Sequence, residues 1–201
     1  MEMEFSKKRI SMEKTMSSLD RFVFDFCNIL EKEGIRYVVV SGYVAIVFGR
    51  SRNTEDIDIL IEKINFKKFE KLWNELKKKY DCINTDDMKT AYYDYLNTKT
   101  AIRFSRKCEI IPNIEFKFVK TQEDKFSLDN AVELNVNKRK ILISPLELQI
   151  AYKLKLGSDK DIDDAIFLYE LFRKELNNEK LKKWTAYFKV PKEIINELNE
   201  N

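Results

Sequence analysis

The segment from Ser41 to Asp58, SGYVAIVFGRSRNTEDID, constrains the fold more than any other part of this chain. It continues from the β-branched run RYVVVSG, which is typical of a buried strand that ends in a glycine turn. The apolar residues YVAIVFG then predict a brief helix that ends at Gly49. After a polar linker, DIDILIE predicts a second strand. The segment therefore predicts a strand, a glycine turn, a short helix and an acidic strand in close succession.

The acidic strand places two carboxylates side by side. Residues two apart in a strand point to the same face, so Asp56 and Asp58 share one face while Ile57 and Ile59 point to the core. Their Cα atoms are expected to lie roughly 7 Å apart, which allows the two side chains to hold one divalent ion or a pair of ions. The alternative is an ordinary solvated acidic loop.

The glycine turn adds a second kind of group to this stretch. Gly42 allows a phosphate to approach the backbone, and the first amides of the helix from Tyr43 are anion donors. One end of the stretch therefore suits phosphate and the other suits magnesium.

Composition narrows the range of functions. The chain has 201 residues and no histidine, which excludes histidine-based triads and imidazole bases. Charged residues are abundant, but the formal net charge is only +3, so overall charge does not identify a nucleic-acid-binding protein. The three cysteines, Cys27, Cys82 and Cys108, form no CxxC pair and predict neither a disulfide framework nor a zinc site.

The same composition predicts where the protein works. We find no long apolar run, so we expect neither a signal peptide nor contact with a membrane, and a reducing cytoplasm fits the free cysteines. The richness in Lys, Glu and Ile with few glycines resembles thermophile composition.

Hydrophobic patterns predict the remaining elements. We expect helices over 18–33 and around Phe66–Leu76, a tyrosine-rich helix near 86–96, strands at 100–107 and 114–120, and a hairpin that turns near Asn137. Ser144 is expected to cap a helix that ends at Gly157, with a further helix from Ser158 or Asp159. The chain then divides into an α/β core with an N-terminal helix (1–143) and a helical region packed on it (144–201).

With these residues in place, the chain resembles the DNA polymerase beta-like nucleotidyltransferases, whose signature is a GG or GS turn, a short helix and a DxD strand. The resemblance is closest to the minimal prokaryotic branch that includes the AbiEii-like abortive-infection toxins. It implies an α+β fold, with a nucleotidyltransferase-like mixed β-sheet flanked by helices and a C-terminal helical extension. The matching residues are Ser41, Gly42, Ala45, Gly49, Arg52, Thr54, Asp56, Ile57, Asp58 and Ile59.

The resemblance also implies roles for these residues. Asp56 and Asp58 would bind Mg²⁺ or Mn²⁺. The turn would hold the phosphates of the nucleotide, through the stretch from Ser41 to Tyr43 together with Arg52 and Thr54. Two positions depart from the family pattern: Ser41 replaces the first glycine, and Tyr43 replaces a phosphate-binding serine.

Family members usually add a third carboxylate from a neighbouring strand. In IEFKFVK, the apolar residues would face the core and leave Glu115 and Lys117 on the polar face, so Glu115 is the candidate for catalysis and metal binding. The alternatives are an ordinary exposed strand glutamate at this position, and Glu109 as the third carboxylate.

A second match lies in AYKLKLGSDKDIDDAIFL, which resembles the C-terminal pattern of the family at Lys153, Lys160, Asp161 and Asp164. The stem of Lys153 lies near an apolar stripe, so we expect its ammonium to emerge toward a cleft as a phosphate ligand. The two aspartates would orient Lys153 or bind the base and ribose of the nucleotide. The alternative is helix capping with surface salt bridges, and an arginine common in the family is replaced at Ser158.

The function implied is metal-dependent transfer of a nucleoside monophosphate from ATP or GTP to a hydroxyl acceptor, with release of pyrophosphate. The acceptor could be RNA such as tRNA, a protein side chain or a small molecule such as an aminoglycoside. Two alternatives are a non-catalytic NTP-binding protein with a cognate toxin or antitoxin partner, and a purely structural domain. Basic residues that could contact RNA are Arg103, Arg106, Lys107, Lys138, Arg139 and Lys140.

Overall fold

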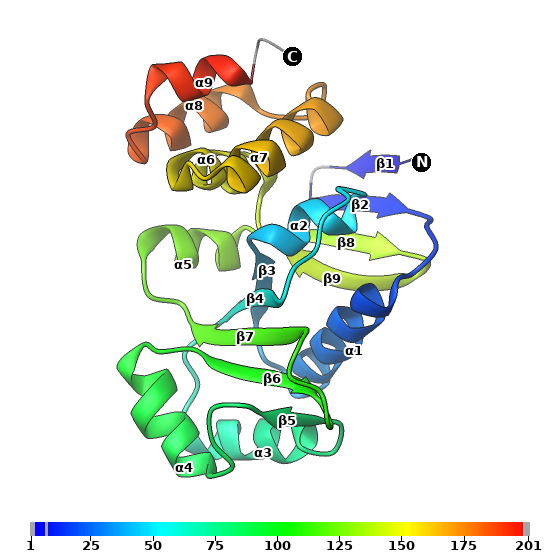
Figure 1. Ribbon diagram of the computed structural model, residues 1–201, viewed down its shortest axis with the longest axis vertical. Helices are drawn as coiled ribbons and strands as arrows, with labels where there is room; N and C mark the ends of the chain where they lie inside the picture. The colour runs from blue at the N-terminus through cyan, green and yellow to red at the C-terminus, as the bar shows by residue number, and fades with distance from the viewer. Residues whose placement is uncertain (1–2, 7, 199–201) are drawn as a thin grey trace.

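A computed structural model describes residues 3–6 and 8–198, and these form a mixed β-sheet covered by helices (Figure 1). Within them, nine strands join one sheet in the order β1-β2-β8-β9-β3-β4-β7-β6-β5. The predicted α+β class is confirmed. The strands are β1 (Met3–Ser6), β2 (Arg9–Met12), β3 (Tyr37–Val40), β4 (Asp56–Ile61), β5 (Tyr80–Cys82), β6 (Ile102–Arg106), β7 (Asn113–Phe118), β8 (Val132–Val136) and β9 (Arg139–Ile143).

The helices for which ranges were predicted lie close to those ranges. A π-helical turn at Ala91–Tyr95 and a 3₁₀ turn at Leu96–Thr98 extend the helix that begins at Met88. The α-helices are α1 (Ser18–Lys32), α2 (Gly42–Val47), α3 (Phe66–Leu76), α4 (Met88–Thr90), α5 (Gln122–Asp129), α6 (Leu146–Leu156), α7 (Asp159–Phe172), α8 (Asn178–Tyr187) and α9 (Lys192–Glu197).

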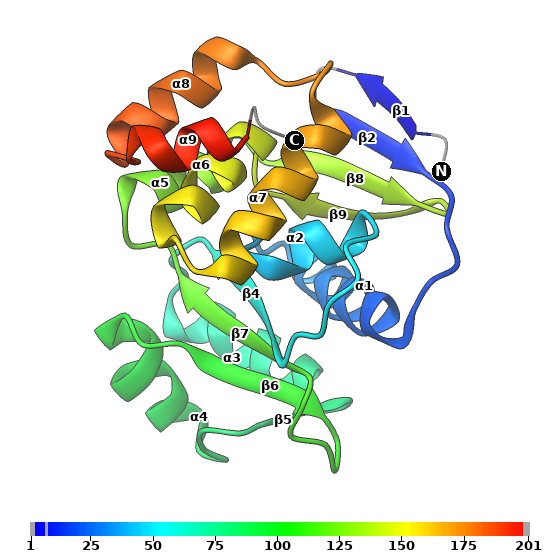
Figure 2. The ribbon, with the colours of Figure 1, turned by 45° about the horizontal axis from the view of Figure 1, so that its top comes forward.

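The helices lie in groups around the sheet. α1 packs against α3 and β9, whereas α2 packs against β3, β4 and α7 (Figure 2). The helices from Leu146 onward lie together at one end of the molecule, where α6 packs against α7 and α8. Residues 1–2 and 199–201, at the ends of the two expected parts, and residue 7 lie outside the described residues. Among the residues that the structure describes, no helix is long and apolar enough to span a membrane.

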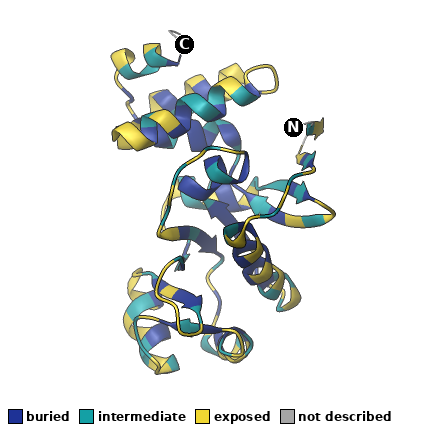
Figure 3. Ribbon diagram, turned by 45° about the vertical axis from the view of Figure 1, so that its right-hand side comes forward, coloured by how far each residue is buried: buried dark blue, intermediate teal, exposed yellow. Residues whose placement is uncertain are grey.

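Aromatic side chains fill the core beneath the sheet. Phe26 of α1 contacts the rings of Tyr80, Phe104 and Phe116, at centroid distances of 5.3, 5.7 and 6.1 Å. Figure 3 shows the buried positions concentrated in the central strands and on the inner sides of the helices. Burial of these large rings packs β5, β6 and β7 against α1.

Three local features differ from the predictions. The edge strands β1 and β2 were not expected, and neither was α5. Ser144 does not cap α6, because Pro145 occupies the N-cap position while the Ser144 hydroxyl lies 3.1 Å from the hydroxyl of Ser127. The predicted hairpin is confirmed, since Asn137 and Lys138 adopt φ angles of 49° and 66° between β8 and β9.

A buried carboxylate joins the first two helices. Asp20 of α1 accepts hydrogen bonds from the Tyr43 hydroxyl of α2 at 2.8 Å and from the Ser17 amide at 2.9 Å. The Ser17 hydroxyl also donates to it at 2.8 Å, and the ammonium of Lys14 lies 3.0 Å away. Burial alone would raise the pKa of Asp20, but these donors outweigh it and hold the pKa below its ordinary value of 3.8.

This carboxylate makes stability depend on pH. Because the folded pKa is lowered, the stabilisation by Asp20 is present above about pH 4 and is lost as the pH falls through the folded pKa. Asp20→Asn is expected to lower the free energy of unfolding by about 2 kcal/mol at pH 7, with a smaller loss at pH 3. Urea unfolding at both pH values measures the change in the free energy of unfolding, and Asp25→Asn, at an exposed position, is the control. An equal loss at both pH values would contradict the assignment.

Candidate active site

Three neighbouring strands bring the predicted catalytic residues together. β4 runs antiparallel to β3 and parallel to β7, so that Asp58 lies opposite Val40 on one side and Glu115 on the other. The predicted alternation of β4 is confirmed, because Ile57 and Ile59 are fully buried while Asp56 is exposed and Asp58 is half-buried. The sheet therefore places Asp58 and Glu115 side by side, next to the end of β3.

Asp56 lies at the open end of this row. Thr54 donates from its hydroxyl to the backbone oxygen of Asp56 at 2.8 Å, and the same hydroxyl lies 3.4 Å from the Asp56 carboxylate. Asn113 lies opposite Asp56 in β7. The contact with Thr54 fixes the backbone and leaves the carboxylate exposed to an incoming ligand.

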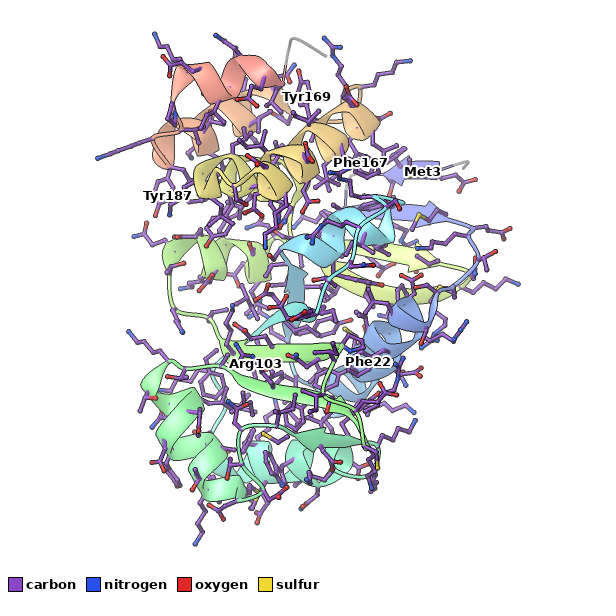
Figure 4. The ribbon with its side chains drawn as sticks, in the orientation of Figure 1. Met3, Phe22, Arg103, Phe167, Tyr169 and Tyr187 are labelled. Atoms are coloured by element: carbon purple, nitrogen blue, oxygen red, sulfur yellow. The ribbon has the colours of Figure 1, made fainter. Side chains whose placement is uncertain are left out.

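A lysine lies between the other two carboxylates. The Lys117 ammonium lies 2.8 Å from Asp58 Oδ1 and 3.2 Å from Glu115 Oε1. Arg103, which extends from β6 (Figure 4), contacts the other oxygen of Glu115 at 3.1 Å. Burial alone would raise the pKa of Glu115, but Lys117 and Arg103 outweigh it and hold the pKa below its ordinary value. Glu115 is thus an ionised but weakly basic group.

These contacts test whether the residues suit divalent metal ions. Asp56 and Asp58 offer hard carboxylate oxygens on one face of a strand, which is the donor type that Mg²⁺ prefers. The expected third ligand does not fit as well, because both oxygens of Glu115 contact basic side chains. Across residues 3–6 and 8–198, no three acidic or cysteine side chains are grouped so that they could hold a metal. The donor set fits one ion better than two.

The turn after β3 has an unusual backbone. Ser41 adopts φ 64° and ψ −144°, a conformation that glycine tolerates and other residues rarely adopt. The side chain of Gln149 in α6 holds it in place, accepting from the Ser41 amide at 3.1 Å and donating to the Ser41 oxygen at 2.8 Å. Gln149 was not singled out in the sequence. The only signal was its spacing, four residues before Lys153 on the same helix face.

The backbone strain at Ser41 leads to a prediction about stability. Ser41→Gly is expected to raise the free energy of unfolding by about 1 kcal/mol, because relief of backbone strain exceeds the added flexibility of the unfolded chain. Thermal or urea unfolding measures it. As a matched control, Ser51→Gly in the exposed linker should be neutral or slightly destabilising. A lower stability for Ser41→Gly would show that the turn does not require a glycine conformation.

The neighbouring turn residues have separate roles. A side chain at Gly42 would collide with the guanidinium of Arg52, so only glycine allows Arg52 to lie against the turn. The side chain of Tyr43 is fully buried and points to Asp20, so only its backbone amide remains available to a ligand. As first residues of α2, Gly42 and Tyr43 have no acceptor for their amides within the helix.

The second set of predicted residues forms a buried ionic network. Asp164 is fully buried and accepts a bidentate contact from Arg52 at 3.0 and 2.9 Å. The Lys153 ammonium lies 3.0 Å from Asp164 and 2.5 Å from Asp161. The Arg50 guanidinium approaches Asp164 at 3.6 Å. The network ties α6 and α7 to the linker before β4.

The expectation that the Lys153 ammonium emerges toward a cleft is therefore wrong. Lys153 is only 2% exposed, because Asp161 and Asp164 hold its charge inside the protein. The contacts match the other part of the expectation, in which the two aspartates orient Lys153. Lys160 is exposed on α7. Arg52 likewise lies close to the turn with its charge balanced by Asp164.

A pocket of about 170 Å³ opens beside the carboxylates, between the sheet, α5 and α6. Ser41, Asp58 and Lys117 are among the residues that line it. The remaining walls are mainly apolar with a few hydroxyl and acidic groups, from Val40, Leu60, Glu123, Asp124, Ser127, Ser144, Leu148, Gln149, Tyr152 and Leu156. The strained turn and the central carboxylate therefore face one cavity.

The other predicted residues lie outside this pocket. Glu109 lies in the turn before β7 and pairs with Arg106 at 3.5 Å, so it is not the neighbour of Asp58. Four of the six basic residues expected to contact RNA lie beside acidic partners: Arg103 beside Glu115, Arg106 beside Glu109, Arg139 beside Asp25 and Lys140 beside Glu31. Their charge is thus largely balanced.

The arrangement was compared with known proteins. No protein-family model and no curated protein matches the sequence. Among solved structures, an antigenic nucleotidyltransferase-like protein from Paracoccidioides brasiliensis shares 17% identity, covering 92% of this chain and 94% of that chain, with a TM-score of 0.56.

Two further structures have similar folds. ANT(2″)-Ia in complex with adenylyl-2″-tobramycin shares 12% identity, covering 86% of this chain and 98% of its own, with a TM-score of 0.56. The lincosamide antibiotic adenylyltransferase LnuA, bound to lincomycin, shares 13% identity, covering 79% and 99%, with a TM-score of 0.51. This chain therefore has a nucleotidyltransferase-like fold, as the resemblance of its turn and DxD strand implied.

Proposed function

We propose that this protein is a metal-dependent nucleotidyltransferase, which moves a nucleoside monophosphate from ATP or GTP to a hydroxyl acceptor. The observation that carries the proposal is the shared pocket, in which the strained turn at Ser41 and the carboxylate of Asp58 line the same cavity. A strained backbone and a carboxylate that line one concave site are typical of functional sites. The nucleotidyltransferase-like fold supports this reading.

Each group has a role in this proposal. Asp56 and Asp58 would hold Mg²⁺ or Mn²⁺, which supplies positive charge to the phosphate oxygens when bound. The amides of Gly42 and Tyr43 would contact phosphate. Thr54 fixes the backbone of Asp56, and the network of Arg52, Lys153, Asp161 and Asp164 fixes the linker and the turn.

The reaction follows the usual course of phosphoryl transfer. The acceptor oxygen forms a bond to the α-phosphorus while the bond from that phosphorus to the bridging β-phosphate oxygen breaks. Pyrophosphate leaves with the electron pair, and the acceptor proton passes to water. Both oxygens of Glu115 contact basic side chains, so its part in this proposal is to hold Lys117 and Arg103 rather than to remove this proton.

The sequence and the pocket favour two different classes of acceptor. RNA such as tRNA, with a toxin role and a cognate antitoxin, is the acceptor proposed from the sequence. The acidic pocket residues Glu123 and Asp124 instead favour a cationic acceptor such as an aminoglycoside. Two of the structures with similar folds are complexes with adenylyl-2″-tobramycin and with lincomycin, which supports a test of small-molecule acceptors.

The proposal is tested by transfer of label from each α-labelled NTP, with Mg²⁺, to total tRNA, to cell-extract protein and to a panel of aminoglycosides and lincosamides. Label in one fraction is expected, and that fraction names the acceptor. Stable NTP binding without label in any fraction would favour the alternative, a non-catalytic NTP-binding protein of a toxin–antitoxin pair. The replacement of the usual glycine by Ser41 is the observation that favours this alternative.

A further inference from the structure

Lys117 occupies a position where a metal ion would bridge two carboxylates. Its ammonium contacts Asp58 at 2.8 Å and Glu115 at 3.2 Å, and the strand register brings all three groups together, since Asp58 lies opposite Glu115 and Lys117 follows two residues later. In two-metal phosphoryl-transfer sites, bridging carboxylates hold a divalent ion in such a place. Here a singly charged side chain of the protein lies there.

The surroundings make displacement of Lys117 costly. Arg103 contacts the second oxygen of Glu115, so an ion bound to Glu115 would have to break two ion pairs. It would also leave Lys117, whose side chain is 24% exposed, next to a divalent cation. Like charges at such short range repel strongly when water is largely excluded.

Asp56 is in a different situation. Its carboxylate is exposed, and Thr54 provides its hydroxyl contact at 3.4 Å. The ion pair between Asp58 and Lys117 uses Oδ1, and Oδ2 takes no part in this pair. The carboxylates of Asp56, Asp58 and Glu115 carry three negative charges, and Lys117 and Arg103 carry two positive charges. The remaining single negative charge suits one divalent ion more than two.

We infer that Lys117 is a built-in cation in place of one of the two divalent ions, so that the nucleotide-loaded site holds a single ion at Asp56 and Asp58. The inference rests on the proposed function, because it concerns the same site. Lys117 also lines the pocket with Ser41, so its ammonium lies where a bound phosphate would meet it. The protein thereby supplies one of the two positive charges from its own chain.

The number of ions bound with a nucleotide tests this. Free Mn²⁺ is followed by electron paramagnetic resonance during titration with the α,β-methylene analogues of the four NTPs. Wild type is expected to bind one Mn²⁺ per bound nucleotide, and Lys117→Met two, because methionine keeps the apolar stem without the charge. Lys120→Met, an exposed lysine two residues after the same strand, is the matched control and should bind one. Lys117→Arg keeps the charge and should also bind one.

Each outcome is decisive. Two Mn²⁺ ions per nucleotide in wild type would overturn the inference, while the proposed function would stand. One ion in both wild type and Lys117→Met would show that Lys117 does not take the place of the second ion. Folded wild type that binds neither nucleotide nor Mn²⁺ would overturn the proposed function itself. If Lys117→Met does not fold, Lys117→Gln replaces it, and the wild-type count needs no variant.

Discussion

Asp58→Asn is expected to lower kcat/KM for nucleotidyl transfer by about a thousandfold. Asparagine has the same shape but no charge, so it binds a divalent ion weakly and leaves Lys117 without one of its two carboxylate partners. The fold should persist, because Asp58 lies at the pocket surface and the core residues on either side of it are unchanged. The loss would therefore concern chemistry rather than folding.

The measurement is the α-label transfer assay, with circular dichroism to show that the variant is folded. Asp129→Asn is the matched control, because Asp129 is an exposed carboxylate in an ion pair with Arg36 and should retain full activity. Transfer by folded Asp58→Asn within a factor of about three of wild type would show that this carboxylate does not hold the catalytic ion.

Asp164→Asn is expected to destabilise the protein by about 3–5 kcal/mol, the loss typical of breaking a buried ionic network. Asp164 is fully buried among Arg50, Arg52 and Lys153. Removing its charge leaves an excess of buried positive charge that the interior does not solvate. Transfer should fall as well, since Arg52 would lose its anchor beside the turn.

The adjacent residue provides the control for this prediction. Asp163 pairs with Arg50 at 2.8 Å, but its side chain is 60% exposed, so Asp163→Asn should cost no more than about 1 kcal/mol. Urea unfolding at pH 7 compares the two variants. Similar small losses for both would mean that the network contributes little to stability.

The segment from β3 to β4 could be predicted from local sequence patterns. The β-branched run of β3, the glycine turn and the alternation of DIDILI depend on neighbours in the sequence, so the strands and the shared face of Asp56 and Asp58 could be predicted. The same alternation placed Glu115 on the polar face of β7, whereas its position on a strand next to Asp58 was implied only by the family resemblance.

Features that depend on distant partners could not be predicted in this way. β2 is a four-residue strand that pairs with β8, more than a hundred residues away. The direction of the Lys153 side chain depends on Asp161 and Asp164. The direction of the Lys117 side chain depends on Asp58, which is 59 residues away in the sequence. Helical and strand periodicity report which face is apolar, not which charge lies opposite.

The most direct test of the central claim is where a nucleotide binds, measured by hydrogen–deuterium exchange with and without NTP and Mg²⁺. If the turn, the carboxylates and the pocket form one nucleotide site, protection should concentrate in peptides that cover 40–48, 54–60 and 146–156. Protection confined to other regions, such as the β8–β9 hairpin, would contradict the assignment of this pocket as the nucleotide site.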